Sequence, residues 1–451
     1  MMHPKNPEFY QKVAEIPAFD CHTHIDASHP VARGLHDVLL YHMVISDLYS
    51  AGCPDGSRLS EDPSEEEARS RILQAIDYLP AIENTSCYFA LRIILRDLFD
   101  WDEPVTRENW EILDRRIREY AKRPNRVQEV MAKANIIKSN TELWRGRDGS
   151  LDSIFTYSLE WAFFTRAQWG RYDTALIELE YAWNHEEPCP PLPVTLTPDL
   201  ICFSKKIHTL EDVEAALAHF WSKIPFDRII TVASHLSTEI HYRPVTGEQM
   251  QEALRRRDSA GPAERDIYAN YIFNRSLELY EQGNYHTVLQ FSTGAEPLPF
   301  ETGSKMPSET VFELAHVFAE HPSISFNLHV SNAASNQAMC TLARELPNVS
   351  LNGYWWHNFF PSYIGRVLSE RLDMLSVRKI VGYFSDAYCM EWAYAKAKII
   401  RTITSDVLWD RIVSGQYDEE TALRIAGELF CGSAVRLFGL EAGEFGQGGN
   451  H

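Results

Sequence analysis

The chain has 451 residues, of which 45% are hydrophobic and 24% charged, a balance typical of a globular protein with a sizeable core. Its formal net charge of −20 argues against binding to nucleic acid or anionic membrane surfaces, because both attract basic patches. No signal-peptide pattern opens the chain, and no apolar run approaches the roughly 18 residues of a membrane span. The 8 cysteines include no Cys-x-x-Cys pair. We therefore expect a cytoplasmic protein with buried thiols and no membrane contacts.

Short and nearly continuous apolar runs recur along the chain and predict parallel strands that are buried on both faces. The expected strands lie near residues 19–24, 135–139, 193–198, 229–235, 287–293, 324–330, 349–356 and 380–386. Helix starts separate them, for example at Thr209 and at Pro307-Ser308-Glu309. Strands that alternate with helices in this way predict a single TIM-type (β/α)8 barrel over residues 1–440, rather than an open sheet.

The gap between the first two expected strands is about 110 residues, far more than one crossover needs. It contains helical signals such as the capping box Ser64-Glu65-Glu66-Glu67. We interpret residues 27–130 as a helical insertion over the barrel mouth. Smaller insertions are expected at 145–190 and 237–283, and a disordered glycine-rich tail at 441–451.

Two histidines end the first apolar run, in the segment Phe19-Asp20-Cys21-His22-Thr23-His24. On a strand, residues i and i+2 point to the same side, so His22 and His24 direct two imidazoles at one point. Imidazole nitrogens are good ligands for divalent transition metals. The alternative interpretation is a histidine-rich loop beside a strand.

Further polar residues follow the later strands, at the end of a parallel barrel where active groups gather. His235, His329 and Asp386 follow the fourth, sixth and eighth expected strands. Alone, such a histidine is commonly structural and such an aspartate is commonly a helix N-cap. Their common position favours a catalytic metal site of His22, His24 and Asp386, with His235 or His329 as a fourth ligand.

The chain resembles the amidohydrolase superfamily, whose barrels carry His-x-His on the first strand and a metal-binding aspartate on the eighth. Within it, the chain is most similar to the uronate isomerase (glucuronate isomerase) family, in order over nearly its whole length. The matching segments are Asp20-Cys21-His22-Thr23-His24, Tyr41-His42, Ser234-His235-Leu236, Gln290-Phe291-Ser292-Thr293-Gly294-Ala295, Leu351-Asn352-Gly353-Tyr354-Trp355-Trp356 and Gly382-Tyr383-Phe384-Ser385-Asp386-Ala387-Tyr388. The resemblance implies the barrel fold and one bound divalent metal.

The chain departs from the family at residues that the family uses to hold a hexuronate. The family's eighth-strand arginine is replaced by Tyr388, and the tyrosine after the inserted histidine by Met43. The fifth-strand histidine is Ser292, the arginine shortly after the inserted tyrosine is lost at Val44-Ile45-Ser46, and His329 stands where the family has asparagine. The metal end is retained while the substrate end is changed. One of three other arginines could take the missing role: Arg92, Arg96 or Arg243.

The favoured activity is aldose–ketose isomerisation of a uronic acid or related sugar acid, with Asp386 as the base and His42 as a shuttle for the hydroxyl proton. Trp355 and Trp356 are expected to pack against the sugar, or else to be core residues. Met43, Ser292 and Tyr388 complete the expected substrate pocket. Because guanidinium groups are missing, we expect poor turnover of glucuronate and galacturonate.

Two other functions stay open at this point. One is a mononuclear metal-dependent hydrolase of a small carbohydrate-like ester, lactone or amide, in which His235 or His329 polarises the carbonyl. The other is a degenerate barrel that only binds a ligand. For the enzyme we expect one divalent metal, zinc first, with iron, manganese, nickel and cobalt as alternatives. The expected partners are a small sugar-acid-like substrate and further copies of the chain in a homo-oligomer.

Overall fold

The computed structural model describes residues 2–60, 63–146, 149–160, 174–186, 203–298 and 302–440. Its centre is an eight-stranded sheet in which every pair of neighbouring strands is parallel. In spatial order the strands are β1 (Ala18–Asp20), β2 (Ile136–Glu142), β3 (Phe155–Glu160), β4 (Thr231–Leu236), β5 (Val288–Thr293), β8 (Phe326–Val330), β9 (Val349–Asn352) and β10 (Ile380–Val381).

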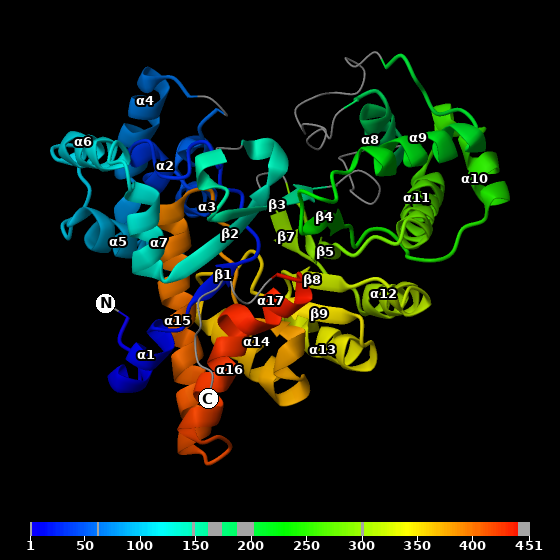
Figure 1. Ribbon diagram of the computed structural model, residues 1–451. Coiled ribbons are helices and arrows are strands. Elements are labelled where there is room, and N and C mark those ends of the chain that lie inside the picture. The colour runs from blue at the N-terminus through cyan, green and yellow to red at the C-terminus, as the bar shows by residue number, and fades with distance from the viewer. Residues whose placement is uncertain are drawn as a thin grey trace.

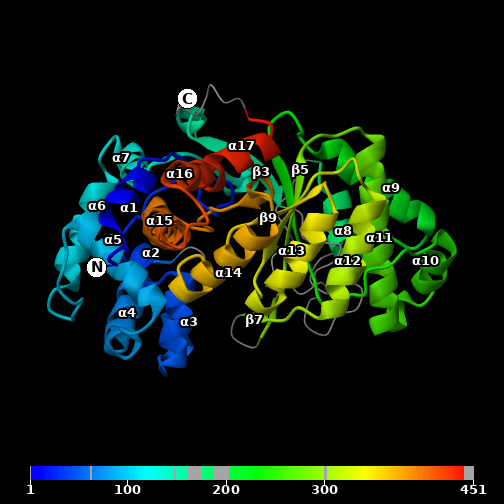
Figure 2. The ribbon, with the colours of Figure 1, turned by 90° about the horizontal axis from the view of Figure 1, so that it is seen from below.

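The two outer strands meet through the extended segments that follow them. The Asp386 N–H donates to the His22 carbonyl at 2.9 Å, and the His24 N–H donates to the Ala387 carbonyl at 2.8 Å. The Ser385 N–H donates to the buried carboxylate of Asp20 at 2.7 Å. These bonds join the end of β10 to the end of β1, so the predicted TIM-type (β/α)8 barrel is confirmed (Figures 1 and 2).

Helices surround this barrel. They are α1 (Pro7–Ala14), α2 (Leu35–Leu39), α3 (His42–Ser50), α4 (Glu65–Ile76), α5 (Ser86–Phe99), α6 (Trp110–Ala121), α7 (Arg126–Ala134), α8 (Thr174–Trp183), α9 (Leu210–Lys223), α10 (Gly247–Leu254), α11 (Pro262–Gln282), α12 (Ser308–Glu320), α13 (Asn336–Glu345), α14 (Pro361–Met374), α15 (Met390–Val413), α16 (Glu419–Gly427) and α17 (Ser433–Leu437). The long helix α15 is buried on most of its circumference because α1, α5, α7 and α14 all pack against it.

The segment between β1 and β2 carries α2 to α7, which gather on one side of the barrel, while α8 to α11 lie on the opposite side (Figures 1 and 2). The helix starts predicted at Thr209 and Pro307 are confirmed: Thr209 and Asp212 form a capping box on α9, and α12 begins at Ser308. The segment 237–283, predicted as an insertion, forms α10 and α11 between β4 and β5.

Every predicted strand overlaps an observed one except the run at 193–198, which lies outside the described residues. The third strand of the barrel is instead β3, inside the segment 145–190 that was predicted to be an insertion. That prediction was wrong because apolar and polar residues alternate in Phe155-Thr-Tyr-Ser-Leu-Glu160, whereas strands buried on both faces are expected as continuous apolar runs. The predicted tail at 441–451 is also outside the described residues.

Two further findings concern the whole described part of the chain. No helix within it is long and apolar enough to cross a bilayer. The cysteines within it are all free thiols, and all except Cys431 are buried, as predicted. A short antiparallel hairpin, β6 (Ala295–Pro297) and β7 (Thr302–Ser304), follows β5 at the barrel mouth.

Candidate metal centre

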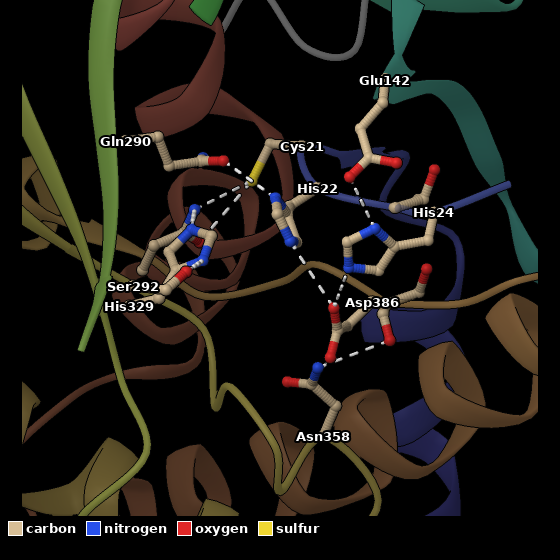
Figure 3. A network of polar contacts seen from close by, with 12 residues as sticks. Cys21, His22, His24, Glu142, Gln290, Ser292, His329, Asn358 and Asp386 are labelled. Atoms are coloured by element: carbon tan, nitrogen blue, oxygen red, sulfur yellow. Dashed lines mark hydrogen bonds and ion pairs between the residues drawn. The ribbon is translucent and has the colours of Figure 1, made fainter. Parts of the chain in front are cut away.

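The segments that follow β1 and β10 bring His22, His24 and Asp386 together (Figure 3). The Oδ1 atom of Asp386 lies 3.5 Å from His22 Nε2 and 3.2 Å from His24 Nε2. One ligand atom from each residue lies within 4.8 Å of the other two. The sequence spacing accounts for the histidine pair, because residues i and i+2 of an extended segment face the same side.

The outer nitrogen of each imidazole is held by a hydrogen-bond acceptor. His22 Nδ1 lies 3.0 Å from Gln290 Oε1, and His24 Nδ1 lies 2.9 Å from Glu142 Oε1. The amide nitrogen of Gln290 donates to Asn327 Oδ1 at 3.2 Å, so the amide oxygen is the atom that faces His22. An amide oxygen and a carboxylate oxygen only accept, so both Nδ1 atoms are donors. Both Nε2 atoms therefore carry a lone pair when the rings are neutral.

The resulting arrangement places three electron-rich atoms at one buried point. Asp386 Oδ1 is buried without a hydrogen-bond partner among the described residues. Burial raises the pKa of Asp386, but hydrogen bonds from the His22 and His24 imidazoles, when these carry a proton on Nε2, and the charge of Lys396 hold it well below its usual range, so the carboxylate is ionised. Two imidazoles and one carboxylate that leave further positions open are the donor set of a catalytic divalent metal. The residues therefore fit the metal that the sequence implied.

The peptide of Asp386 is held in an unusual conformation by two buried donors. Its φ angle is 54°, in the left-handed region that non-glycine residues rarely adopt. Lys396 Nζ on α15 donates to the Asp386 carbonyl at 3.1 Å, and the Tyr41 hydroxyl donates to the same oxygen at 3.0 Å. Lys396 Nζ also donates to the Tyr41 oxygen at 2.8 Å. Burial lowers the pKa of Lys396 to about 8. These contacts direct the carboxylate toward the histidines.

Glu142, at the end of β2, joins His24 to a nearby cation. Its second carboxylate oxygen accepts a hydrogen bond from Arg145 Nε, and the Glu142 side chain is only 2% exposed. Glu160, at the end of β3, lies close enough that His24, Glu142 and Glu160 form a second group with metal-ligand spacing. Because Arg145 already neutralises Glu142, and Glu142 already accepts from His24, the first group is the better metal site.

The structure does not bring His329 into the metal group. Asn352 Nδ2 donates to His329 Nε2 at 2.9 Å, and His329 Nδ1 lies 3.4 Å from Ser292 Oγ. Burial lowers the pKa of His329 well below its usual value, so its imidazole is neutral and donates through Nδ1. Its lone pair is thus occupied by Asn352, and its ring stacks on Phe384 with centroids 4.5 Å apart. The His329 ring also contacts the His22 ring, with centroids 4.7 Å apart.

Among the predicted substrate residues, Tyr388 contacts the metal group, and ring contacts lead from Tyr388 to His42 and Trp356. The Tyr388 ring stacks on the His24 ring with centroids 5.1 Å apart. The centroid of the His42 ring lies 5.3 Å from that of Tyr388 and 5.6 Å from that of Trp356. Met43, on α3 next to His42, lines a cavity with Trp356. The rings therefore contact one another in the order His24, Tyr388, His42 and Trp356, and Trp356 lines the cavity.

His235 and Trp355 lie elsewhere on the rim, with ring centroids 5.7 Å apart. His235 Nε2 is 4.0 Å from Glu296 Oε1, so His235 belongs to a different polar group from His22 and His24. The turn that carries the two tryptophans requires Gly353, whose φ is 37° and where a Cβ would lie 2.1 Å from the Phe384 ring.

Two of the arginines proposed as replacements, Arg92 and Arg96, are held by neighbouring acidic residues. Arg92 donates to the Asp102 side chain at 3.0 Å, and Arg96 donates to Asp97 at 2.8 Å. The main chain of Arg243 is bonded to Asn270 in the loop after β4. Among the described residues, Arg145 lies near the site, with its guanidinium carbon 5.3 Å from the Tyr388 ring centroid, and no sequence pattern pointed to it.

Sequence reasoning also missed Glu142, Gln290 and Lys396 as functional residues. The second strand was predicted to end at 139, because Ser139-Asn140-Thr141 is polar, so Glu142 was not considered as a strand-end residue. Gln290 lies in a segment that resembles the family, and nothing in that segment marks it as the partner of His22. Lys396 is on a helix and acts through a backbone carbonyl. A signal for it exists, since a lysine in the otherwise apolar segment 392–397 of a buried helix needs a polar partner.

Comparison with known proteins identifies the fold. No protein-family model matches the chain, and no curated protein sequence matches it either. Solved structures do match. The chain superposes on glucuronate isomerase from Caulobacter crescentus with a TM-score of 0.74 at 14% identity, covering 97% of both chains. Uronate isomerase from Thermotoga maritima gives 0.73 at 14% identity, covering 96% of both. Uronate isomerase from Bacillus halodurans C-125 gives 0.67 at 16% identity, covering 96% of both. At these identities the similarity establishes the fold, and the predicted resemblance is confirmed at that level.

Proposed function

We propose that the chain is a metal-dependent aldose–ketose isomerase of a sugar acid or a closely related sugar. The observation that carries this proposal is the convergence of His22 Nε2, His24 Nε2 and Asp386 Oδ1 at the C-terminal end of the barrel strands. The fold shared with uronate isomerases supports the reaction class.

His22, His24 and Asp386 would hold one divalent metal, with zinc as the first choice because zinc favours imidazole and carboxylate ligands. When bound, such an ion polarises a carbonyl or hydroxyl oxygen of the substrate and stabilises the negative charge of an enediolate. Gln290 and Glu142 accept hydrogen bonds from the two Nδ1 atoms and would thereby leave the Nε2 lone pairs available to the metal. Lys396 and Tyr41 keep the Asp386 peptide in place.

Isomerisation also requires proton transfer between adjacent carbons. Asp386 is the proposed base, since its ionised carboxylate is buried at the centre of the site. His42 is the proposed shuttle for the hydroxyl proton, because its ring contacts the rings of Tyr388 and Trp356. His235 is a second candidate acid–base group at the rim, where Trp355 packs beside it.

Two features make hexuronates poor candidates for the best substrate. Tyr388, in the position of the family arginine, stacks on His24 and offers no guanidinium. Arg145 already pairs with Glu142. A carboxylate bound to a desolvated guanidinium gains roughly 1.5–3 kcal/mol, so its absence corresponds to about tenfold or more in specificity.

The test is a product screen with protein of known metal content. Aldoses, uronates and lactones would be incubated in deuterated water and followed by NMR. We expect conversion of an aldose to a ketose, lost in Asp386→Asn and in His22→Ala, which should also lose metal. His241→Ala, at an exposed histidine paired with Glu313, is the matched control and should retain both properties. Lactone or ester hydrolysis without any isomerisation would contradict the proposal.

A further inference from the structure

Three neighbouring strands of the barrel carry buried polar side chains that bond to one another from strand to strand. They are Gln290 on β5, Asn327 and His329 on β8, and Ser350 and Asn352 on β9. Bulky branched apolar residues usually fill the core of such a barrel. Burying amide groups instead costs free energy unless each one is hydrogen-bonded, so their arrangement here points to a role beyond packing.

Asn327 is the centre of this set. Its Oδ1 atom accepts from Gln290 Nε2 at 3.2 Å and from Asn352 Nδ2 at 2.8 Å. Its Nδ2 atom donates to Ser350 Oγ at 2.9 Å, and Ser350 Oγ donates to the Phe326 carbonyl at 3.2 Å. A carbonyl can only accept and a hydroxyl has one proton, so Ser350 has to accept from Asn327. The Phe326 carbonyl thereby determines that the oxygen of the Asn327 amide faces Gln290.

The imidazole of His22 lies between two acceptors that compete for its proton (Figure 3). Gln290 Oε1 is 3.0 Å from Nδ1, and Asp386 Oδ1 is 3.5 Å from Nε2. If the Gln290 amide turned over, its nitrogen would donate to Nδ1, and the ring proton would move to Nε2 and bond to the Asp386 carboxylate. Hydrogen bonds to charged groups are the stronger kind, so the metal-free protein would favour that state, which has no lone pair at the metal position. Asn327 opposes it, because the turned amide would place Gln290 Oε1 against Asn327 Oδ1, and both atoms only accept.

We propose that Asn327 is a positioning residue of the metal site. It acts through Gln290: it holds the amide so that the His22 proton stays on Nδ1, and it prevents the hydrogen bond between His22 and Asp386 that would compete with the metal. The ligand atoms are thus kept available before a metal binds. This inference rests on the metal site of the proposed function, and it does not depend on which reaction the metal serves.

The position of the His22 ring proton in the metal-free protein is the direct test. Nitrogen chemical shifts of ¹⁵N-labelled histidine distinguish the Nδ1–H from the Nε2–H form, and the signals that are lost in His22→Ala assign them. The measurement is made above about pH 8, where imidazoles are neutral. The native protein should show the Nδ1–H form. Asn327→Leu, with the same branching but no acceptor, should shift His22 toward the Nε2–H form. The same variant should bind Zn²⁺ about tenfold more weakly in a competition titration with a chelator.

Asn327→Asp separates positioning from packing. A carboxylate at this position still accepts from Gln290 Nε2, so the His22 proton should stay on Nδ1 and zinc affinity should not fall, although a buried charge lowers the stability of the fold. A residue needed only for packing would give the opposite order, with the aspartate variant at least as impaired as the leucine variant. Asn270→Leu is the matched control, since Asn270 is also buried and its amide bonds to the main chain of Arg243 and of His241. It should keep the native proton position and zinc affinity.

An unshifted His22 proton in Asn327→Leu would overturn the inference, and so would native zinc affinity in that variant. A shift to the Nε2–H form in Asn327→Asp would overturn it as well, whether or not the leucine variant folds. If the proton moves as expected but the native protein binds no zinc, the proposed metal function fails while the control of His22 by Asn327 stands. If zinc binds through His22 and the proton does not move, the metal site stands and this inference fails.

Discussion

Replacing Glu142 by glutamine tests how the site controls the protonation of His24. In the native protein, one carboxylate oxygen accepts from His24 Nδ1 at 2.9 Å while the other accepts from Arg145. Glutamine has one acceptor oxygen and one donor nitrogen in the same volume. Arg145 can only donate, so the amide oxygen is expected to turn toward Arg145 and the amide nitrogen toward His24. His24 Nδ1 must then accept, which places the ring proton on Nε2, where the metal would bind.

The size of the effect follows from the hydrogen bond that is lost. Hydrogen bonds to charged groups contribute roughly 1.5–3 kcal/mol, and the Glu142 side chain is only 2% exposed, so solvent does little to replace this one. At 1.4 kcal/mol per factor of ten, metal affinity should fall by about 10- to 100-fold, the usual range for a partner that orients a histidine ligand. The change should appear in binding, with little loss of fold.

The assay is a competition titration of Zn²⁺ against a chromogenic chelator, for the native protein and three variants. Glu160→Gln, the other nearby carboxylate, is the control and should change affinity much less. The double variant Glu142→Gln/Arg145→Met should recover part of the lost affinity, because without Arg145 the amide oxygen can turn back to His24 Nδ1. The reasoning is refuted if Glu142→Gln binds zinc within twofold of the native protein, or if removal of Arg145 gives no recovery.

Three further outcomes follow from the geometry of the site. Lys396→Met should weaken zinc binding by about tenfold, because the Asp386 carbonyl loses its 3.1 Å donor and the left-handed Asp386 peptide can relax. Tyr41→Phe should weaken zinc binding by a smaller factor. Native zinc affinity of both variants in the chelator titration would contradict this role of the two residues. Chelation should lower the thermal unfolding temperature, and added zinc should restore it. At a metal concentration 100 times Kd, binding raises the free energy of unfolding by about 2.7 kcal/mol. An unchanged unfolding temperature in a thermal scan would argue against a bound metal. Burial raises the pKa of Asp20 from 3.8 to about 7. Between these values the unfolded state binds fewer protons than the folded state, so stability should fall as pH rises through this window and level off above it. In Asp20→Asn this fall should be absent. The free energies of unfolding of the variant and the native protein, measured with denaturant, should therefore diverge by at most about 1.4 kcal/mol per pH unit between pH 4 and 7.

Local sequence patterns predicted most strands of the barrel. Continuous apolar runs identified the strands that are buried on both faces, such as β8, in which every residue is buried. Continuous apolar runs did not identify β3, whose alternating pattern resembles that of a half-exposed strand. For this reason Glu160 was not predicted as a residue at the end of a strand. The same limit applied to β2, because its polar C-terminal half, residues 139–142, is held in the sheet by pairing with β3. Strand pairing decided both cases, and pairing is not a local property.

By itself, the sequence determined that His22 and His24 face the same way, because the pleat of an extended chain alternates side chains regardless of what surrounds it. It also placed Asp386 after the last strand, at the same end of the barrel. Tertiary structure alone decided that Gln290 and Glu142 hold the outer nitrogens, that His329 is bound by Asn352 and excluded from the metal group, and that Lys396 supports the Asp386 peptide. These contacts join residues that are far apart in the chain, such as His22 and Gln290, 268 positions apart. Their distances depend on strand register and helix packing, which are set by the whole core.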